Sequence, residues 1–292
     1  MNESQQRREL TESEIIAYAT LVEALKITLS KRLETRIKPT LKLFQSQAFT
    51  SIQTTGVINP SILSVVKADL EGTLSTFYAE SQILTNNFDD AFYGVKTPPL
   101  QLTQTDILKN KLIAGEQTQI ILQNLSEDYG RIFSQVDEGI AELKKAQTVE
   151  ELKKMDFYKK LPSSDKILLE RAIKQTEEEL KKHYEGMREK YAKQGVKLRT
   201  AQSLENTSLF ESSTVVEKFR YAKAGNEFSM KKEWCAVRDG RTRPAHSQAD
   251  GKRVNMNEAF IVGGERLLYP RDRSQGASLE NVVRCRCTVI YV

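Results

Sequence analysis

The stretch WCAVRDGRTRPAH at residues 234–246 is followed, about 40 residues later, by RCRC at residues 284–287. Together these two stretches contain the only tryptophan, all three cysteines and one of the two histidines of the 292-residue chain. Glycine and proline are frequent from Gly225 onward, and short apolar runs such as Phe260-Ile261-Val262 stand between them, as is typical of turns and short strands. The sequence therefore predicts a small α+β domain at residues 225–292.

The residues before this domain indicate long, charged helices. Two capping boxes, each a threonine followed three residues later by a glutamate, begin at Thr11 and Thr148. Apolar residues recur at helical spacing after the first box, and Pro39 is expected to interrupt that helix before a shorter one at residues 41–53. The most regular helix is predicted from Ser163 to about residue 194, with Gly195 as its end.

The predicted fold class is mainly α, with long helices in a bundle or in extended hairpins, followed by the small α+β C-terminal domain. Glycines within residues 105–146 are expected to break the helix predicted there. The predicted regions are an N-terminal helical region (1–97), a second helical region ending in a long amphipathic helix (98–195), a linker or helix (196–224) and the basic C-terminal domain (225–292).

Composition excludes some classes of protein. No stretch approaches 18 uncharged apolar residues, so a membrane span is not expected. Residues 1–8 are not followed by an apolar segment, which predicts no secretory signal and synthesis in the cytoplasm. Three cysteines are an odd number, and the close pair Cys285 and Cys287 does not suit a bridge between them. Reduced thiols or metal ligands fit better than a disulfide framework.

The net charge of +5 is unevenly distributed. From Thr214 onward the chain has 15 basic and 9 acidic residues, so this part holds all the excess positive charge. Such a region suits contact with phosphates or with an acidic protein surface, although the same charges can simply solvate a small domain. The residues predicted to contact nucleic acid, without sequence specificity, are Arg238, Arg243, Lys252, Arg253, Arg271 and Arg273.

A metal site is one hypothesis for the cysteines. Cys235, His246, Cys285 and Cys287 form a permitted set of zinc ligands. A small, glycine-rich domain with little apolar mass would gain stability from a bound zinc ion. The Cys-x-Cys spacing is tighter than that of common zinc motifs, so the alternative is a buried pair of cysteines beside a hydrogen-bonded histidine.

A nucleophilic cysteine is another hypothesis, with Asp239 and a histidine completing a Cys-His-Asp arrangement. Nothing in the sequence indicates an oxyanion hole, and the phosphate-binding loop of NTPases is absent from it. A structural role is favoured instead: Asp239 and Arg241 are expected to join Arg243 and Arg286 in a web of salt bridges. Trp234 is expected to fill the core of the domain.

The ordered motif resembles the C-terminal domain of the phage Mu F-like minor head proteins, also called phage head morphogenesis proteins. The resemblance covers about 60–70 residues and begins with Trp-x₄-Asp-x-Arg-Thr-Arg-x₂-His, from Trp234 to His246. It continues through residues 260–265 and 268–270 and ends at Cys285-Arg286-Cys287-Thr288. The positions that match the family type are Asp239, Arg241, His246, Cys285 and Cys287. Cys235 does not belong to that motif.

The resemblance implies a minor structural protein of a tailed phage or prophage and does not imply an enzyme. It implies association with the portal inside the capsid, a role in head assembly and in DNA packaging or ejection, and non-specific DNA contact. The implied partners are the portal protein, capsid or scaffold proteins, and DNA. Two alternatives stay open. One is a cytoplasmic DNA-binding or adaptor protein whose C-terminal domain is stabilised by a bound metal ion, and the other is a cysteine hydrolase.

Overall fold

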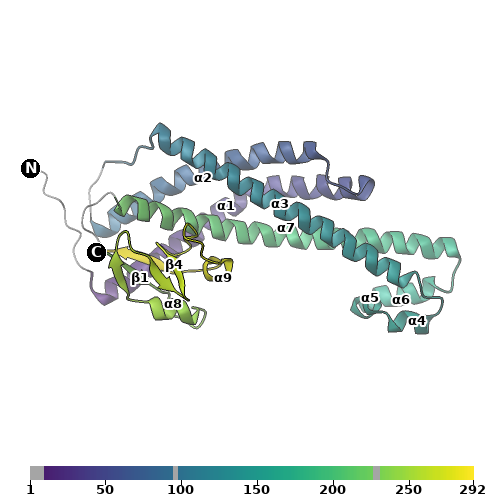
Figure 1. Ribbon diagram of the computed structural model, residues 1–292. Helices are drawn as coiled ribbons and strands as arrows, with labels where there is room; N and C mark the ends of the chain where they lie inside the picture. Colours follow the sequence, from purple (N-terminus) through teal and green to yellow (C-terminus); the bar gives the residue numbers. More distant parts are fainter. Residues whose placement is uncertain (1–9, 95–97, 226–230) are drawn as a thin grey trace, which may run out of the picture. The chain divides into compact units, whose positions relative to one another are not determined.

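The computed structural model describes residues 10–94, 98–225 and 231–292. Residues 1–8, on which the expected absence of a signal rests, lie outside this part. The described chain consists of long helices followed by a small region of short strands, which confirms the predicted fold class (Figure 1). The helices before the strands are α1 (Glu12–Thr55), α2 (Pro60–Tyr93), α3 (Gln104–Leu143), α4 (Val149–Lys154), α5 (Asp156–Lys160), α6 (Ser163–Ala172) and α7 (Glu177–Ala224).

Both predicted capping boxes begin helices. At the start of α1, the backbone N–H of Thr11 donates to Glu14 Oε2 over 2.9 Å, and the N–H of Glu14 donates to Thr11 Oγ1 over 3.4 Å. At the start of α4, the N–H of Glu151 donates to Thr148 Oγ1 over 3.2 Å. These contacts satisfy backbone donors that the first helical turn leaves without partners.

The predicted helix at residues 163–194 is wrong, because the chain forms two helices there. Helix α6 ends at Ala172, and α7 begins at Glu177. Thr176, which lies inside the predicted helix, caps the second one instead. Its hydroxyl accepts the N–H of Glu179 over 3.3 Å, in a third capping box.

The predicted interruptions at Pro39, Gly139 and Gly195 are also wrong, because α1, α3 and α7 continue through them. A Cβ atom at Gly195 would lie 2.8 Å from Ile132 Cγ2, and one at Gly139 would overlap the ring of Phe157. These glycines therefore allow neighbouring side chains to approach the helix axis. Pro39 lies between apolar side chains that are fully buried, and their packing offsets the hydrogen bond that a proline removes.

The chain divides into two compact units. Unit 1 contains residues 1–38, 69–117 and 204–292, and unit 2 contains residues 39–68 and 118–203. Each of the four long helices contributes residues to both units. The division by sequence order into four regions stays a prediction.

Unit 2 has an apolar interior. Phe44 of α1 stacks on Tyr129 of α3 with 5.6 Å between ring centroids, and Phe49 contacts Phe133. A cluster of buried residues joins α3, α7 and the short helices between them: Val136, Ile140, Leu143, Ala146, Leu152, Tyr158, Leu161, Leu169, Tyr184 and Met187. Burial of this apolar surface explains why residues 118–203 form a compact unit.

Residues 231–292, here called the terminal region, form the strand-containing part of unit 1. A three-stranded antiparallel sheet has the order β2-β1-β5, and β3 and β4 form a separate hairpin. Gly263 and Gly264 connect the hairpin with φ values of +60° and +81°, as a two-residue turn of this kind requires. The elements are β1 (Lys231–Cys235), α8 (Pro244–Ala249), β2 (Arg253–Asn255), β3 (Phe260–Val262), β4 (Glu265–Leu267), α9 (Leu279–Val282) and β5 (Thr288–Tyr291).

Trp234 is fully buried at the centre of the terminal region's core. Its ring meets Phe260 edge-on, with 5.3 Å between centroids. Phe210, Tyr221 and Ala224 of α7 belong to or pack against the same core. The terminal region therefore shares its apolar core with the C-terminal part of α7. Among the described residues, no helix combines the length and the apolarity that crossing a membrane requires.

Candidate functional site

The candidate site lies where β1 ends and β5 begins. Trp234 lies opposite Val289 in this antiparallel pair, and Cys235 lies opposite Thr288. Because successive side chains point to opposite faces of a strand, the two pairs face opposite sides of the sheet. Cys287 precedes Val289 by two residues and so shares the face of Trp234. Cys235 points to the other face.

The face of Trp234 carries a buried group of His246, Cys285 and Cys287, here called the histidine–cysteine cluster. The Cys285 sulfur lies 3.5 Å from His246 Nδ1, and the Cys287 sulfur lies 3.4 Å from the same atom. The three side chains are only 2%, 2% and 3% exposed. Pro244 opens α8 and places His246 in its first turn. Two sequence motifs that lie about 40 residues apart thus converge on one buried point.

The imidazole ring of His246 is oriented by α9 and the β3–β4 hairpin. Its Nε2–H donates to Asn281 Oδ1 over 2.8 Å. The Asn281 amide in turn donates to the Val262 carbonyl over 2.8 Å and to Glu265 Oε2 over 2.9 Å. Because an amide oxygen only accepts hydrogen bonds, Nε2 carries a proton, and Nδ1 is the ring nitrogen that faces the two sulfurs.

Hydrogen bonding shifts the pKa values of the two cluster thiols in opposite directions. The contact with Cys287 lowers the pKa of the Cys285 thiol well below its ordinary value, in spite of burial. The same contact, together with burial, raises the pKa of the Cys287 thiol. Burial lowers the pKa of His246, but its hydrogen bonds to Cys285 and Asn281 outweigh burial and leave that pKa raised. Thiolate character therefore belongs to Cys285, and Cys287 keeps its proton.

The structure brings together three of the four predicted metal ligands. The ligand atoms of His246, Cys285 and Cys287 all lie within 4.8 Å of one another, which is compact enough to hold a metal ion. In the described part of the chain, no fourth histidine, cysteine, aspartate or glutamate joins them. Strand alternation is the reason that Cys235 is absent from this group.

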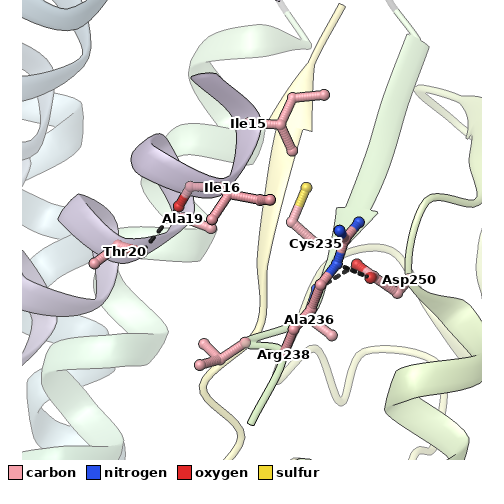
Figure 2. A pocket seen from close by; sticks show the side chains of 9 residues that line it. Ile15, Ile16, Ala19, Thr20, Cys235, Ala236, Arg238 and Asp250 are labelled. Atoms are coloured by element: carbon pink, nitrogen blue, oxygen red, sulfur yellow. Dashed lines mark hydrogen bonds and ion pairs between the residues drawn. The ribbon is translucent and has the colours of Figure 1, made fainter. Parts of the chain in front are cut away.

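Cys235 lies in a small pocket on the opposite face of β1 (Figure 2). The pocket has a volume of about 60 Å³ and is also lined by Ile15, Ile16 and Ala19 of α1. Burial raises the pKa of the Cys235 thiol strongly, so this thiol stays protonated. A protonated thiol is a poor nucleophile, and the pocket has room for only about two water molecules.

Asp239 connects the stretch at residues 234–246 to the stretch at residues 284–287. The guanidinium of Arg286, which stands between the two cluster cysteines, forms a two-pronged contact with the Asp239 carboxylate at 2.8 and 2.5 Å. The Arg241 backbone N–H also donates to this carboxylate, over 3.0 Å. The hydrogen bond from Arg286 is the main reason that the pKa of Asp239 lies well below its ordinary range. Arg243 instead donates to the Val283 carbonyl.

The contacts of His246 also bear on the hypothesis of a nucleophilic cysteine. The predicted Cys-His-Asp arrangement is not formed, because His246 Nε2 bonds to Asn281 and Asp239 bonds to arginines. Cys285, His246 and Asn281 do follow the hydrogen-bond order of a Cys-His-Asn triad. The cysteine and the histidine are each 2% exposed, so a substrate would need the region to open first.

The residues predicted to contact nucleic acid fall into three groups. Arg271 is 3% exposed and donates to the Cys285 carbonyl, so it has no exposed charge to offer a phosphate. Three others form ion pairs or hydrogen bonds within the chain: Arg238, Arg243 and Arg253. Lys252 and Arg273 are exposed. The basic excess counted from the sequence therefore overstates the positive charge at the surface.

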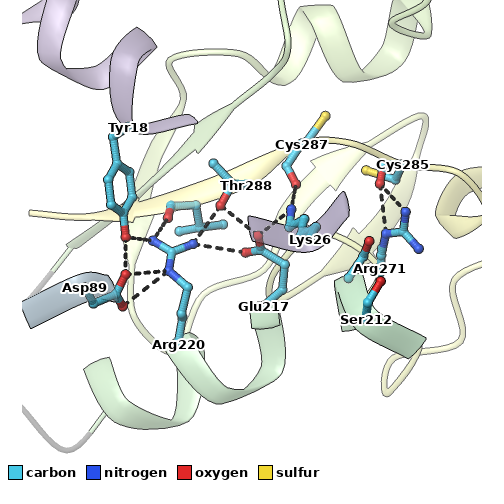
Figure 3. Close-up of polar contacts among 12 residues, drawn as sticks. Tyr18, Lys26, Asp89, Ser212, Glu217, Arg220, Arg271, Cys285, Cys287 and Thr288 are labelled. Carbon is cyan, nitrogen blue, oxygen red and sulfur yellow. Dashed lines mark hydrogen bonds and ion pairs between the residues drawn. The ribbon is translucent and has the colours of Figure 1, made fainter. Parts of the chain in front are cut away.

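Sequence reasoning missed a second polar centre, the buried charge cluster of Lys26, Asp89, Glu217 and Arg220 (Figure 3). The Lys26 ammonium pairs with Glu217 over 2.7 Å and donates to the Cys287 carbonyl over 2.9 Å. The Arg220 guanidinium donates to Thr288 Oγ1 over 2.6 Å and to the Val289 carbonyl over 2.7 Å. These contacts attach α1 and α7 to the start of β5.

Tyr18 and Asp89 complete the buried charge cluster. Arg220 donates to the Tyr18 hydroxyl over 2.6 Å, and that hydroxyl donates to Asp89 Oδ1 over 2.5 Å. The cluster contains two cations and two carboxylates, so its charges balance. All four are at most 2% exposed, and such burial is tolerated only when charges are paired and hydrogen-bonded.

The sequence did contain a signal for this cluster. Lys26 stands four residues after Val22 and three residues before Leu29, both of which are buried. These spacings place a lysine within the apolar stripe of the helix. A charged residue at a core position predicts a buried partner, but the helical period cannot identify a partner almost 200 residues away.

Comparison with known proteins gives a family match for the part of the chain that contains residues 234–246 and 284–287. Residues 167–290 match the family of phage Mu protein F like proteins. This part of the chain is Mu F-like. The match includes the histidine–cysteine cluster, Asp239 and the Arg220 end of the buried charge cluster, and it covers less than half of the chain.

Two curated proteins are similar to short stretches of the chain. Over 71 residues, the chain is 37% identical to minor head protein GP7 of Bacillus phage SPP1, which is 24% of this chain and 22% of that protein. Over 64 residues, it is 41% identical to the NAD(+)–arginine ADP-ribosyltransferase EFV of Enterococcus faecalis, which is 22% of this chain and 12% of that protein. The chain thus spans under a quarter of either relative. No solved structure matches it significantly.

The activity in the name of the second relative belongs to that protein. Its matched stretch is 12% of its length, so the similarity assigns no transferase activity to this chain. Each of the two relatives matches a short stretch of this chain, and their names describe two different functions.

Proposed function

We propose that this protein is a minor head protein that acts in head morphogenesis of a tailed phage or prophage. The observation that carries the proposal is the Mu F-like match over residues 167–290, together with the similarity to a minor head protein. The match begins within α6 and includes all of α7 and nearly all of the terminal region.

The terminal region in this proposal is a rigid docking module without catalytic activity. Its polar residues are used to hold the chain together: the histidine–cysteine cluster is buried, and Asp239 is engaged by Arg286. The buried charge cluster fixes β5 to α1 and α7 within unit 1. A module held in this way can present a constant surface to a partner, whereas an enzyme needs a group that its substrate can reach.

The proposed partners are the portal protein and other proteins of the capsid, and the proposed location is inside the head near the portal. The minor head protein to which the chain is similar supports a capsid-related partner. The exposed basic residues support contact with DNA or with an acidic protein surface: Lys252, Arg266, Arg273 and Arg284. Because these contacts are electrostatic, they should be independent of sequence and weakened by salt.

Co-purification tests the portal contact directly. The tagged full-length chain would be co-expressed with the portal protein encoded by the same phage or prophage, and the portal of an unrelated phage would serve as the control. We expect only the cognate portal to co-purify at physiological salt. Failure to co-purify at both low and physiological salt would contradict the portal contact.

A second measurement separates this proposal from that of a free cytoplasmic adaptor. An adaptor would stay in the soluble fraction of the host when heads are purified. A minor head protein would sediment with the heads, whichever of the head proteins is its direct partner.

A further inference from the structure

We propose that His246, Cys285 and Cys287 bind one zinc ion and are its ligands within the part of the chain that the structure describes. The inference is independent of the role in head morphogenesis, because it rests on the geometry of the cluster alone. Zinc takes thiolate and imidazole ligands, and four ligands surround it in most structural sites. The three residues supply three of these positions, and a water molecule is left to supply the fourth.

The spacing of the donor atoms fits a tetrahedral ion. Zinc–sulfur distances of about 2.3 Å and zinc–nitrogen distances of about 2.05 Å place a sulfur and a nitrogen ligand about 3.6 Å apart at the tetrahedral angle. The two cluster sulfurs lie 3.5 and 3.4 Å from His246 Nδ1. The two sulfurs therefore lie about as far from the ring nitrogen as ligands of one zinc ion do.

The hydrogen bonds around the cluster also fit a metal site. A histidine ligand commonly donates its second ring N–H to a fixed acceptor, which sets the tautomer and the direction of the lone pair. Asn281 supplies this acceptor, and it is itself held by the Val262 carbonyl and the Glu265 carboxylate. In the neutral imidazole that binds a metal, the ring nitrogen facing the sulfurs is consequently the unprotonated one.

Buried donors beside the two cysteines favour bound thiolates. Arg271 donates to the Cys285 carbonyl over 2.8 Å, and Lys26 donates to the Cys287 carbonyl over 2.9 Å. The indole N–H of Trp234 is buried and has no partner among the described nitrogen and oxygen atoms. Two thiolates and one zinc ion together are neutral, which suits a site with little solvent.

Cys235 provides a matched control for the ligand set. It is a buried cysteine of the same small region, 3% exposed, and it belongs to the other face of β1. Its replacement removes one thiol and leaves the three proposed ligands unchanged. The sequence alone places four ligands in one set, and the structure separates this cysteine from the other three.

Metal analysis of the full-length protein, purified under reducing conditions after growth with added zinc, is the first test. We expect about one zinc ion per chain for the wild type and for Cys235→Ser. We expect less than about 0.2 for His246→Ala, Cys285→Ser and Cys287→Ser, because a site with two protein ligands is much weaker. Loss of zinc from Cys235→Ser as complete as that from Cys285→Ser would overturn the three-residue set, as would a metal-free wild type.

A titration of the wild type avoids the risk that ligand variants do not fold. The metal-free full chain would be titrated with Co²⁺, and the fluorescence of Trp234, the only tryptophan, would be recorded. The Trp234 and His246 rings lie 5.7 Å apart, so a bound Co²⁺ ion should quench this fluorescence with an end point at one equivalent. A thiolate-to-cobalt absorption band should rise in parallel. An unchanged fluorescence would overturn the proposal.

Asn281→Ala tests the orientation of the histidine in a graded way. This variant keeps all three ligands but loses the acceptor for His246 Nε2–H, so zinc affinity should fall about 10- to 100-fold without being abolished. Affinity equal to that of the wild type would contradict the role assigned to this hydrogen bond and to His246 Nδ1 as the ligand.

Alkylation separates the metal site from a catalytic cysteine. Iodoacetamide should leave Cys285 and Cys287 unmodified in the native, zinc-loaded chain, and it should modify both after chelation and unfolding. Rapid modification of Cys285 in the native chain, lost in His246→Ala, would overturn the metal site in favour of a nucleophile.

Discussion

The two units of the molecule differ in what fills their interiors. Unit 2 is filled mainly by apolar and aromatic side chains, such as Phe44, Tyr129 and Leu143, and Asp165 is a buried charged residue there. Unit 1 has an apolar core around Trp234 as well, but it also contains the buried charge cluster, further buried charged residues such as Arg271, and the histidine–cysteine cluster. The first kind of interior is tolerant, because many apolar side chains of similar volume can fill it. The second is specific, because each polar group needs one particular partner.

This contrast explains how the terminal region can be attached to its helices without a large apolar contact surface. Paired charges contribute little net stability relative to apolar residues of the same size, but a missing partner costs several kcal/mol. Such an arrangement selects one position of β5 against α1 and α7 over alternatives.

The largest effect is expected from Arg220→Met in unit 1. This change leaves Asp89 without its buried cation and Glu217 with Lys26 alone, and it should lower the free energy of unfolding by about 3–5 kcal/mol. The matched change in unit 2 is Arg188→Met, which removes a surface pair with Asp137 and should cost less than about 1 kcal/mol. Urea unfolding of both variants, followed by circular dichroism, gives the comparison. Equal losses would remove the distinction between the two interiors.

A pH dependence is expected from Glu211, a buried residue of unit 1. Burial raises the pKa of this carboxyl from 4.5 to about 7, although the Tyr78 hydroxyl, which donates to it over 2.7 Å, opposes the shift. Between these two values the folded state keeps a proton that the unfolded state loses. This contribution to stability is therefore complete below about pH 4.5 and is lost as the pH rises to about 7, by an amount on the order of 3 kcal/mol.

The variant Glu211→Gln should remove this part of the pH dependence and should be more stable than the wild type at pH 8. Unfolding free energies measured at pH 5 and pH 8 test both statements. Glu205→Gln, on an exposed position of the same helix, should keep the profile of the wild type. An identical slope in the wild type and in Glu211→Gln would show that this carboxyl is not the group responsible.

Substitutions at two glycines of unit 2 should change the stability by smaller amounts, and the two changes should have opposite signs. Gly139→Ala adds a methyl group that overlaps the Phe157 ring, and it should cost about 1–3 kcal/mol. Gly186→Ala adds one where nothing lies within 4 Å, and it should stabilise the helix by up to about 1 kcal/mol. Thermal unfolding distinguishes the two. Stabilisation by both would mean that helix propensity outweighs the close packing at Gly139.

The smallest effect is expected from exposed basic residues. The double variant Lys252→Ala, Arg273→Ala should reduce the slope of log affinity for DNA against log salt by about 2, one for each phosphate contact. The control pair Lys193→Ala, Lys197→Ala in unit 2 should leave it unchanged. Fluorescence anisotropy with a labelled duplex, at several salt concentrations, measures both. Binding by the wild type that does not depend on salt would contradict phosphate contact altogether.

Local patterns predicted the local structure well. The capping boxes at Thr11 and Thr148 and the apolar stripes of the long helices depend on residues a few positions apart, and the structure contains them. Gly139 and Gly195 were misread because their role depends on Phe157 and Ile132, which come from other helices. The sequence alone does not distinguish a glycine that ends a helix from one that allows a side chain of another helix to pack closely against it.

The candidate site was only partly predictable from the sequence, because some of its features depend on contacts between distant residues. The motif contained His246, Cys285 and Cys287, and their convergence follows from the way the terminal region folds. The position of Cys235 depends on strand parity, which cannot be assigned until the pairing of β1 with β5 is known. The buried charge cluster joins residues from α1, α2 and α7, and no spacing rule connects positions so far apart.

The central claim is that this chain is a structural component of a phage head, and quantitative mass spectrometry of purified heads tests it most directly. Heads would be prepared from cells in which the phage or prophage develops, and from cells in which the gene for this chain is deleted and then restored. The account predicts that the chain is present in heads at a few copies for each portal, and that it is restored with the gene. Its absence from heads and their precursors, while it accumulates in the soluble fraction, would contradict the account.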